Sequence, residues 1–247
     1  MWPPRWLGEC YSRLYIKYGG EPFTFAEAMG HLSWDRNRLS VAFSKLHSLR
    51  LLLLFHRGRP RLYRLLSPEN VLLLASGTAR NFDRIPQERY LELVLGTLRR
   101  ALRMLDLESF AVYGSVARGT ATGNSDVDIL LISDSFTGSL ASRMDLMCKL
   151  EEEVKDELRW LRKRGIYTGL SFYPLRKGEA ERLPLLLLDM TDEAVIMYDR
   201  KGFLEGLLAN LRARLTVEGA RRVFVKGGYW YWDLRASPTF AGRVGAA

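Results

Sequence analysis

The chain has 247 residues, of which 47% are hydrophobic and 26% charged, the ordinary composition of a soluble globular protein. Its apolar runs are too short to cross a membrane, its two cysteines are isolated, and its first residues lack the apolar core of a secretory signal, so we expect a cytoplasmic protein with no membrane partner. The net charge of +9 is concentrated in residues 1–80, which carry twelve Lys and Arg against five Asp and Glu, an asymmetry typical of a part that contacts nucleic acid.

The first 80 residues predict three helices followed by a β-hairpin. Apolar residues recur at helical spacing from Leu7 to Tyr18, and Gly19-Gly20 ends this first helix. Thr24 and Glu27 fit the capping box of a second helix. The next expected elements are a helix at about 35–49, a strand at 51–55, a basic turn at 57–60 and a strand at 61–66.

This order of elements resembles a winged helix-turn-helix of the archaeal and bacterial transcription-regulator type, in which the third helix enters the major groove. The resemblance implies that residues 1–80 bind nucleic acid, and double-stranded DNA is expected because no aromatic stacking platform is evident on the reading face. The expected contacts are polar residues of the third helix and the hairpin: Arg36, Arg38, Ser40, Lys45, Arg57, Arg59 and Arg61. Winged helices also serve as protein-interaction or dimerisation modules, so this alternative and a homo-oligomer stay open.

A break at residues 76–86 separates a second domain, residues 86–216. A long amphipathic helix is expected to start at Pro86, and the strand 109–113 follows it. The most informative stretch comes next: Gly114-Ser115-Val116-Ala117-Arg118-Gly119, then Asn124-Ser125-Asp126-Val127-Asp128, which runs into a strand at 129–132.

Asp126 and Asp128 flank one apolar residue at the start of a strand, so both side chains should point to one face, with Cα atoms about 6–7 Å apart. Two carboxylates this close repel each other, and one tends to take up a proton unless a cation lies between them. Oxygen ligands of this kind suit Mg²⁺, which commonly bridges to substrate phosphates. The stretch therefore predicts a Mg²⁺ cofactor and a nucleoside triphosphate.

Gly114-Ser115, Gly119 and Ser125-Asp126-Val127-Asp128 resemble the signature of the DNA polymerase beta-like nucleotidyltransferase superfamily, in particular its minimal members and their kanamycin nucleotidyltransferase relatives. The resemblance covers about residues 86–216 and implies a mixed sheet with flanking helices, so the expected fold class is α/β (α+β). It implies that the two aspartates are catalytic metal ligands and that Ser115 and nearby backbone N–H groups hold the β- and γ-phosphates. The remaining residues expected at the nucleotide are Gly114, Arg118, Gly119 and Ser125, although Arg118 is equally consistent with a solvated arginine.

Transferases of this superfamily usually carry a third carboxylate on a later strand, which corresponds here to residues 166–175. Between Glu157 and Glu179 the chain has no Asp or Glu, and Ser171, a poor Mg²⁺ ligand, occupies the expected position. Three explanations stay open. Glu179 or Glu181 reaches the site from the following loop, a two-carboxylate site works slowly with water as a ligand, or the domain binds nucleotide without turnover.

Residues 217–247 form a basic C-terminal tail that is rich in aromatic residues between 223 and 234 and includes Lys226 and Tyr229. These rings either stack on a nucleobase or pack against the core or a second subunit.

The sequence as a whole predicts a metal-dependent nucleotidyltransferase that transfers a nucleoside monophosphate from an NTP to a hydroxyl acceptor and is targeted by a DNA-binding winged helix. The alternative is a DNA-binding transcriptional regulator whose degenerate transferase domain senses a nucleotide or mediates assembly. A third hypothesis, a toxin–antitoxin-type interaction module, rests on analogy with small relatives alone.

Overall fold

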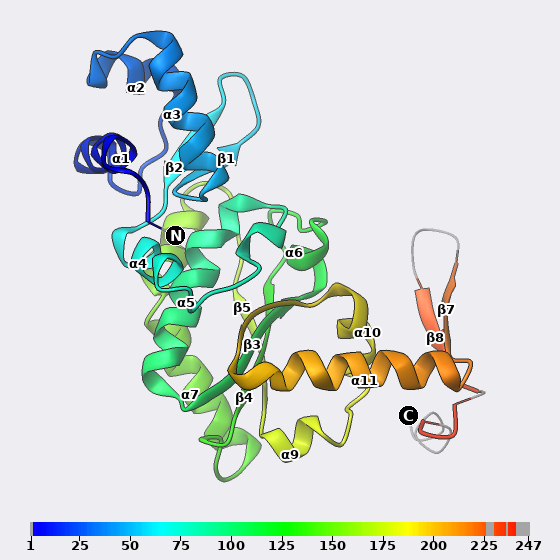
Figure 1. Ribbon diagram of the computed structural model, residues 1–247. Helices are drawn as coiled ribbons and strands as arrows, with labels where there is room; N and C mark the ends of the chain where they lie inside the picture. The colour runs from blue at the N-terminus through cyan, green and yellow to red at the C-terminus, as the bar shows by residue number, and fades with distance from the viewer. Residues whose placement is uncertain (1, 226–229, 236, 241–247) are drawn as a thin grey trace.

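Figure 1 shows the computed structural model, in which residues 2–225, 230–235 and 237–240 are described. Three helices and a two-stranded sheet form an N-terminal unit, and a larger unit is built around a four-stranded sheet. The elements are α1 (Arg5–Tyr18), α2 (Phe25–Leu32), α3 (Arg36–Ser48), β1 (Leu52–His56), β2 (Leu62–Leu65), α4 (Pro68–Ala75), η1 (Phe82–Arg84), η2 (Glu88–Tyr90), α5 (Leu91–Met104), β3 (Leu107–Tyr113), α6 (Gly114–Arg118), β4 (Val127–Ser133), α7 (Leu140–Glu152), α8 (Lys155–Arg162), β5 (Leu170–Leu175), α9 (Lys177–Ala180), α10 (Leu186–Glu193), β6 (Val195–Asp199), η3 (Arg200–Gly202), α11 (Phe203–Val217), β7 (Arg221–Phe224) and β8 (Trp230–Asp233). Within the described ranges, no helix has the length and apolar character needed to span a bilayer.

Two helices of the N-terminal unit, α2 and α3, begin at side-chain caps. Thr24 Oγ1 accepts a hydrogen bond from the Glu27 amide at 3.2 Å, and the Glu27 carboxylate accepts one from the Thr24 amide at 2.7 Å, which confirms the predicted capping box. Asp35 caps α3 by accepting from the Arg38 amide at 2.9 Å. The strands β1 and β2 then pair antiparallel as a hairpin.

The four-stranded sheet has the order β5-β4-β3-β6. β3 runs antiparallel to both β4 and β6, whereas β4 runs parallel to β5, so the sheet is mixed, as predicted. A parallel pair requires a long crossover, which α7 and α8 provide. Alternate residues of β4 enter two separate cores, because Ile129 and Leu131 belong to the core that includes α5 and α7, whereas Leu130 and Ile132 belong to the core that includes α10 and α11.

Two predicted helices differ from the observed ones. The helix expected from Pro86 begins only at Leu91, because the preceding 3₁₀ turn η2 directs Glu88 back to the N-terminal unit. The amphipathic pattern of residues 140–164 predicts a single helix, which the structure divides into α7 and α8 at Val154, whose backbone (φ −117°, ψ 9°) is not helical and whose side chain is buried in the core.

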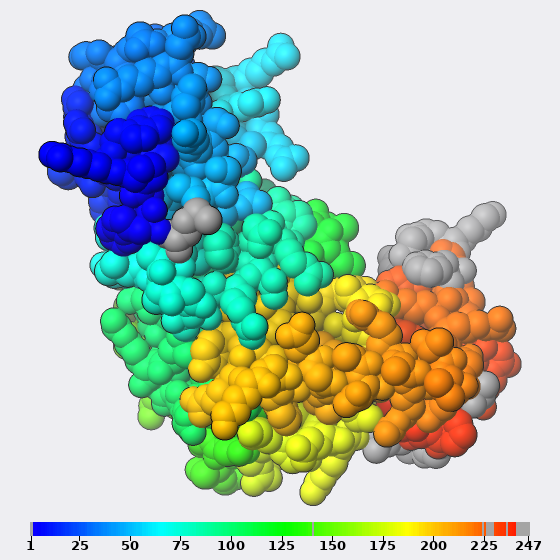
Figure 2. Space-filling model, viewed as in Figure 1, coloured from blue at the N-terminus to red at the C-terminus, as the bar shows by residue number. Residues whose placement is uncertain are grey.

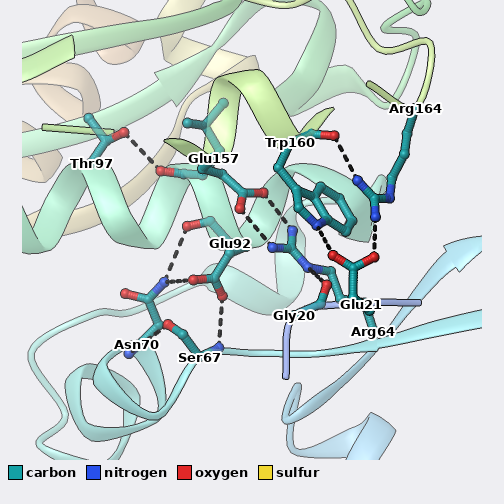
Figure 3. Close-up of polar contacts among 11 residues, drawn as sticks. Gly20, Glu21, Arg64, Ser67, Asn70, Glu92, Thr97, Glu157, Trp160 and Arg164 are labelled. Carbon is teal, nitrogen blue, oxygen red and sulfur yellow. Dashed lines mark hydrogen bonds and ion pairs between the residues drawn. The ribbon is translucent and has the colours of Figure 1, made fainter. Parts of the chain in front are cut away.

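Arg64 of β2 joins the two units (Figure 3). This side chain is almost fully buried, and its guanidinium donates to both carboxylate oxygens of Glu157 in α8, at 2.5 and 2.7 Å. Arg64 Nε also donates to the Gly20 carbonyl, and the guanidinium lies 3.6 Å from the centroid of the Trp160 ring. Trp160 Nε1 in turn donates to Glu21 at 3.1 Å. A bidentate buried pair imposes strict geometry, so these contacts dock the N-terminal unit against α8.

The helix α4 packs against α5 of the larger unit. Glu92 of α5 accepts hydrogen bonds from the Ser67 amide and from Asn70 Nδ2, both at 2.9 Å (Figure 3). Burial raises the pKa of the Glu92 carboxyl, while the bond from Ser67 opposes the rise. The segment that links the hairpin to the larger unit is thus tied to α5.

Candidate active site

The predicted glycine–serine turn lies at the junction of β3 and α6. Gly114 has φ +68° and Gly119 has φ +77°, a backbone conformation that other residues rarely adopt. Val116, between them, is fully buried and anchors the short helix. Ser115 Oγ has no hydrogen-bond partner within the described part of the chain, so its hydroxyl is available to a ligand.

Asp128 lies beside the glycine–serine turn and between strands β3 and β5. On β4 it is the register partner of Tyr113 in β3 and of Ser171 in β5. A Cβ atom on Gly114 would clash with the Asp128 carboxylate, so the glycine backbone lies directly against this side chain. The turn and the strand therefore hold each other in place.

Asp126 lies just before β4 and is fixed by the neighbouring strand segment. Its Oδ1 accepts a hydrogen bond from the Gly169 amide at 2.8 Å. Asp126 acts electrostatically on Asp128, as expected for two carboxylates separated by one residue on extended chain. The pair that the sequence singled out is therefore brought together.

Burial raises the pKa of Asp128 above its usual range, and the negative charge of Asp126 raises it further. A hydrogen bond from the Ser171 hydroxyl and the charge of Arg118 act in the opposite direction. The charged form of the Asp128 carboxylate is therefore disfavoured, and a cation bound beside both aspartates would favour it.

Ser171 stands opposite Asp128, where the third carboxylate was expected. Among the described residues there is no group of three or more His, Cys, Asp or Glu side chains able to hold a metal. Glu179 lies beyond β5 and pairs with Arg143 at 2.7 Å and with Arg176, which hold the pKa of its carboxyl at about 2. Neither Glu179 nor Glu181 joins the two aspartates in such a group, so the explanation that one of them completes the site from the following loop is wrong, and the other two stay open.

The other predicted nucleotide residues take different positions. Arg118 forms an ion pair with Glu193 at the end of α10, with 2.5 Å between Nη1 and Oε2. The Ser125 hydroxyl accepts a hydrogen bond from the Thr122 amide at 2.9 Å and so closes the turn that precedes Asp126. Gly119 packs against the ring of Pro86, where a Cβ atom would lie only 2.9 Å away.

The role of residues 86–90 was not predicted from the sequence. Their side chains alternately contact the loop before Asp126 and the N-terminal unit. Gln87 and Arg89 both donate to the Ala121 carbonyl, at 2.8 and 3.2 Å, and so hold the loop that leads to the aspartates. Glu88, between them, faces the N-terminal unit, where it accepts from the Leu54 amide at 2.6 Å and pairs with Arg50. The sequence pattern predicts the start of a helix at Pro86 and so gives no sign of this alternation.

A second missed feature is the C-terminal hairpin of β7 and β8. Arg222 lies 3.2 Å from Glu193 and stacks on Trp230 and Trp232. Trp232 Nε1 donates to Asp189 at 2.8 Å. Glu193 therefore links Arg118 of the turn to this hairpin, and Trp232 packs against the molecule rather than standing free. Lys226 and Tyr229 of the predicted aromatic tail lie outside the described residues.

The residues expected to contact DNA lie on the N-terminal unit. All of them are exposed, four on α3 and three in the turn between β1 and β2. The Arg38 guanidinium lies 4.0 Å from the centroid of the Trp34 ring, and Lys45 Nζ lies 5.4 Å from that of Trp6.

The segment that contains this site has known relatives. Residues 95–176 match the nucleotidyltransferase domain family. The matched nucleotidyltransferase domain includes the glycine–serine turn, the aspartate pair and Ser171, whereas the N-terminal unit and the C-terminal hairpin lie outside it.

Comparisons of the whole chain give weaker likenesses. A crystal structure of a toxin–antitoxin with AMP-PNP is 13% identical, with a TM-score of 0.33, over 49% of this chain and 89% of that one. A "putative nucleotidyltransferase" from Sulfolobus solfataricus, solved at 1.40 Å resolution, is 20% identical, with a TM-score of 0.23, over 43% of this chain and 89% of that one. No curated protein matches. The nucleotidyltransferase assignment rests on the family match.

Proposed function

We propose that the protein is a metal-dependent nucleotidyltransferase that transfers a nucleoside monophosphate from an NTP to a hydroxyl acceptor. One observation carries the proposal: Asp128 is fixed against the Gly114 turn and beside Asp126, inside the segment that matches the nucleotidyltransferase domain family. Ser115, whose hydroxyl has no other partner among the described residues, supports a role in phosphate binding.

The residues present fit a divalent cation such as Mg²⁺. Asp126 and Asp128 supply hard oxygen ligands, and the raised pKa of Asp128 marks a position where added positive charge is favourable. These two side chains would hold the ion. When bound, the ion neutralises negative charge on the triphosphate and its leaving group.

In the transfer, the acceptor oxygen forms a bond to the α-phosphorus and the bond from that phosphorus to the β-phosphate oxygen breaks, releasing pyrophosphate. The acceptor hydroxyl loses its proton to solvent, because Ser171 is no base near neutral pH. The Ser171 hydroxyl instead donates to Asp128, a hydrogen bond that favours the ionised form of this carboxylate. We therefore expect a slow enzyme.

Transfer is tested by incubating the protein with Mg²⁺ and NTPs labelled at the α-phosphate, against protein, nucleic-acid and small-molecule acceptors. The Asp126→Asn/Asp128→Asn variant should lose at least about 100-fold of the label transferred. Asp145→Asn, which removes an exposed carboxylate of α7 that contacts no residue of the site, is the matched control and should behave as the unmodified protein. Equal labelling by all three proteins, or none by any, contradicts the proposal.

The N-terminal unit is proposed to be a winged helix that binds double-stranded DNA. The order of its elements and the exposed arginines on α3 and on the hairpin turn support this role. Arg36→Ala should weaken binding of random duplex DNA and reduce the dependence of log K on log salt by about one unit. Arg159→Ala on α8 is the control, and a salt-independent affinity would contradict phosphate contacts.

A second function is favoured by Ser171, because the absence of a third carboxylate at this position suits a domain that binds nucleotide without turnover. In that case the protein is a DNA-binding regulator with a nucleotide sensor. Calorimetry with a non-hydrolysable NTP decides between the two. Mg²⁺-dependent binding that alters DNA affinity, without any label transfer, assigns the regulator.

A further inference from the structure

A cavity of about 400 Å³ lies between the β1–β2 hairpin and the nucleotidyltransferase domain. The hairpin lines it with residues 54–58, and the opposite wall consists of residues 86–89 together with Gly119. In Figure 1 the β1–β2 hairpin lies on the side of the larger unit that carries α6, and in Figure 2 the outline is recessed below the projecting cyan atoms of the hairpin. The cavity is separate from the aspartate pair, and its lining combines both units of the chain.

The charged groups of the lining favour an anion. Arg57 and Arg89 are cationic, and His56 adds positive charge when protonated. Glu88 is the one acidic side chain of the lining, and both of its oxygens are engaged, Oε1 by Arg50 and His47 and Oε2 by the Leu54 amide. The positive charge facing the cavity is therefore not cancelled by this carboxylate.

Two lining residues also carry buried polar atoms without a hydrogen-bond partner. These atoms are Gln87 Oε1, an acceptor, and Arg89 Nε, a donor. Buried polar groups are nearly always paired, so an unpaired donor and an unpaired acceptor beside one cavity indicate a ligand that supplies both partners. A nucleotide unit has this chemistry, with phosphate oxygens as acceptors and a base amino group as donor.

The position of the cavity indicates the path that a bound strand would take. Arg57 belongs to the basic turn that is proposed to contact DNA, while Gly119 begins the loop that leads to Asp126. A strand bound along the turn would pass through the cavity before it reached the aspartates. The volume suits a single nucleotide rather than a duplex.

We propose that this cavity binds one unpaired nucleotide of a nucleic-acid strand whose terminal hydroxyl is the acceptor, with its phosphate held by Arg57 and Arg89. The assignment of the acceptor rests on the proposed nucleotidyl transfer. The binding site itself does not, because it is formed by residues that contact neither aspartate.

The test is fluorescence anisotropy with the full-length Asp126→Asn/Asp128→Asn variant, so that binding is measured without turnover. The probes are a blunt DNA duplex and the same duplex with a short single-stranded 3′ overhang. We expect the overhang to bind more tightly than the blunt duplex. On the same background, Arg57→Ala should weaken overhang binding about tenfold more than blunt-duplex binding.

Arg61→Ala is the matched control, because Arg61 is exposed in the same turn but does not line the cavity. This variant should weaken both probes equally. Equal affinity for the two probes, or the same pattern of loss for Arg57→Ala and Arg61→Ala, overturns the proposal. A free mononucleotide that displaces the overhang at micromolar concentration, with the same sensitivity to Arg57→Ala, would assign the cavity to a free nucleotide and also overturn the strand assignment.

Binding without transfer in the unmodified protein separates the two proposals. In that outcome the cavity stands as a nucleic-acid site, and only the nucleotidyl transfer fails. Transfer to a non-nucleic acceptor without any overhang preference has the opposite meaning, since the enzyme then stands and the cavity proposal falls.

Discussion

Gly114 and Asp128 occupy each other's space so closely that a Cβ atom on residue 114 would lie well inside 3.0 Å of the carboxylate. The positive φ of Gly114 is also unfavourable for any other residue. Gly114→Ala should therefore displace Asp128 and abolish metal-dependent nucleotide binding, as measured by calorimetry. Gly206→Ala is the control, because Gly206 lies within α11 and an added Cβ atom there meets no other atom within 4 Å. This variant should leave binding unchanged. Normal binding by Gly114→Ala would show that the turn does not position the carboxylate.

Ser171 can be used to complete the proposed metal site. Ser171→Asp places a third carboxylate opposite Asp128, so Mg²⁺ or Mn²⁺ should bind about tenfold more tightly in a calorimetric titration. In EDTA the same variant should melt at a lower temperature, because three carboxylates then repel one another. Ser171→Ala removes only the hydrogen bond to Asp128 and should not tighten metal binding. Unchanged metal affinity in Ser171→Asp would indicate that this position lies outside the coordination sphere.

The raised pKa of Asp128 sets a pH dependence. The folded protein holds the Asp128 proton more tightly than the unfolded chain, whose carboxyl titrates near 3.8. The free energy that the protonated Asp128 contributes to folding is therefore fully present below the pKa of the unfolded chain. This contribution is lost as the pH rises through the pKa of the folded protein. In the presence of EDTA, Asp128→Asn should melt at a higher temperature than the unmodified protein near neutral pH, and the difference should shrink toward pH 3.8. Melting curves from about pH 4.5 to 8 check this, with Asp145→Asn as the control.

Arg64 and Glu157 hold the two units together, and the loss of one partner leaves a buried charge unpaired. Arg64→Ala should lower the free energy of unfolding by about 3–5 kcal/mol in urea denaturation. Arg159→Ala, which removes an exposed pair with Asp156, should change it by less than about 1 kcal/mol. Replacing both Arg64 and Glu157 by Met should recover part of the loss. Equal effects of Arg64→Ala and Arg159→Ala would contradict a structural role for the pair.

The local features of the site could be predicted from the sequence, because they depend on neighbouring residues. Glycines at the ends of α6 supply positive φ, and alternation along β4 brings Asp126 and Asp128 together. The position of Ser171 followed from the resemblance to the nucleotidyltransferase superfamily, and the register of β4 and β5 places this residue opposite Asp128.

Contacts between distant segments could not be predicted in this way. Arg64 and Glu157 are 93 residues apart, and neither one differs in the sequence from the many other charged residues of this basic chain. Arg118 was expected at the phosphates or in solvent, but its ion pair with Glu193 depends on how α10 approaches the sheet. The sequence predicts helix at the 3₁₀ turn η2, because the departure from helix there follows from the tertiary contacts of Glu88.

The carboxylate of Glu88 connects residues 86–90 to the N-terminal unit through Leu54 and Arg50. The neighbouring Gln87 binds the loop that precedes Asp126. Because Gln87 and Arg89 hold this loop by bonds of their own, neutralising Glu88 would remove the bonds of the hairpin to this segment and leave the loop anchored. The hairpin would then lose its tie to the loop before Asp126, while Arg64 and Glu157 keep the N-terminal unit docked on α8.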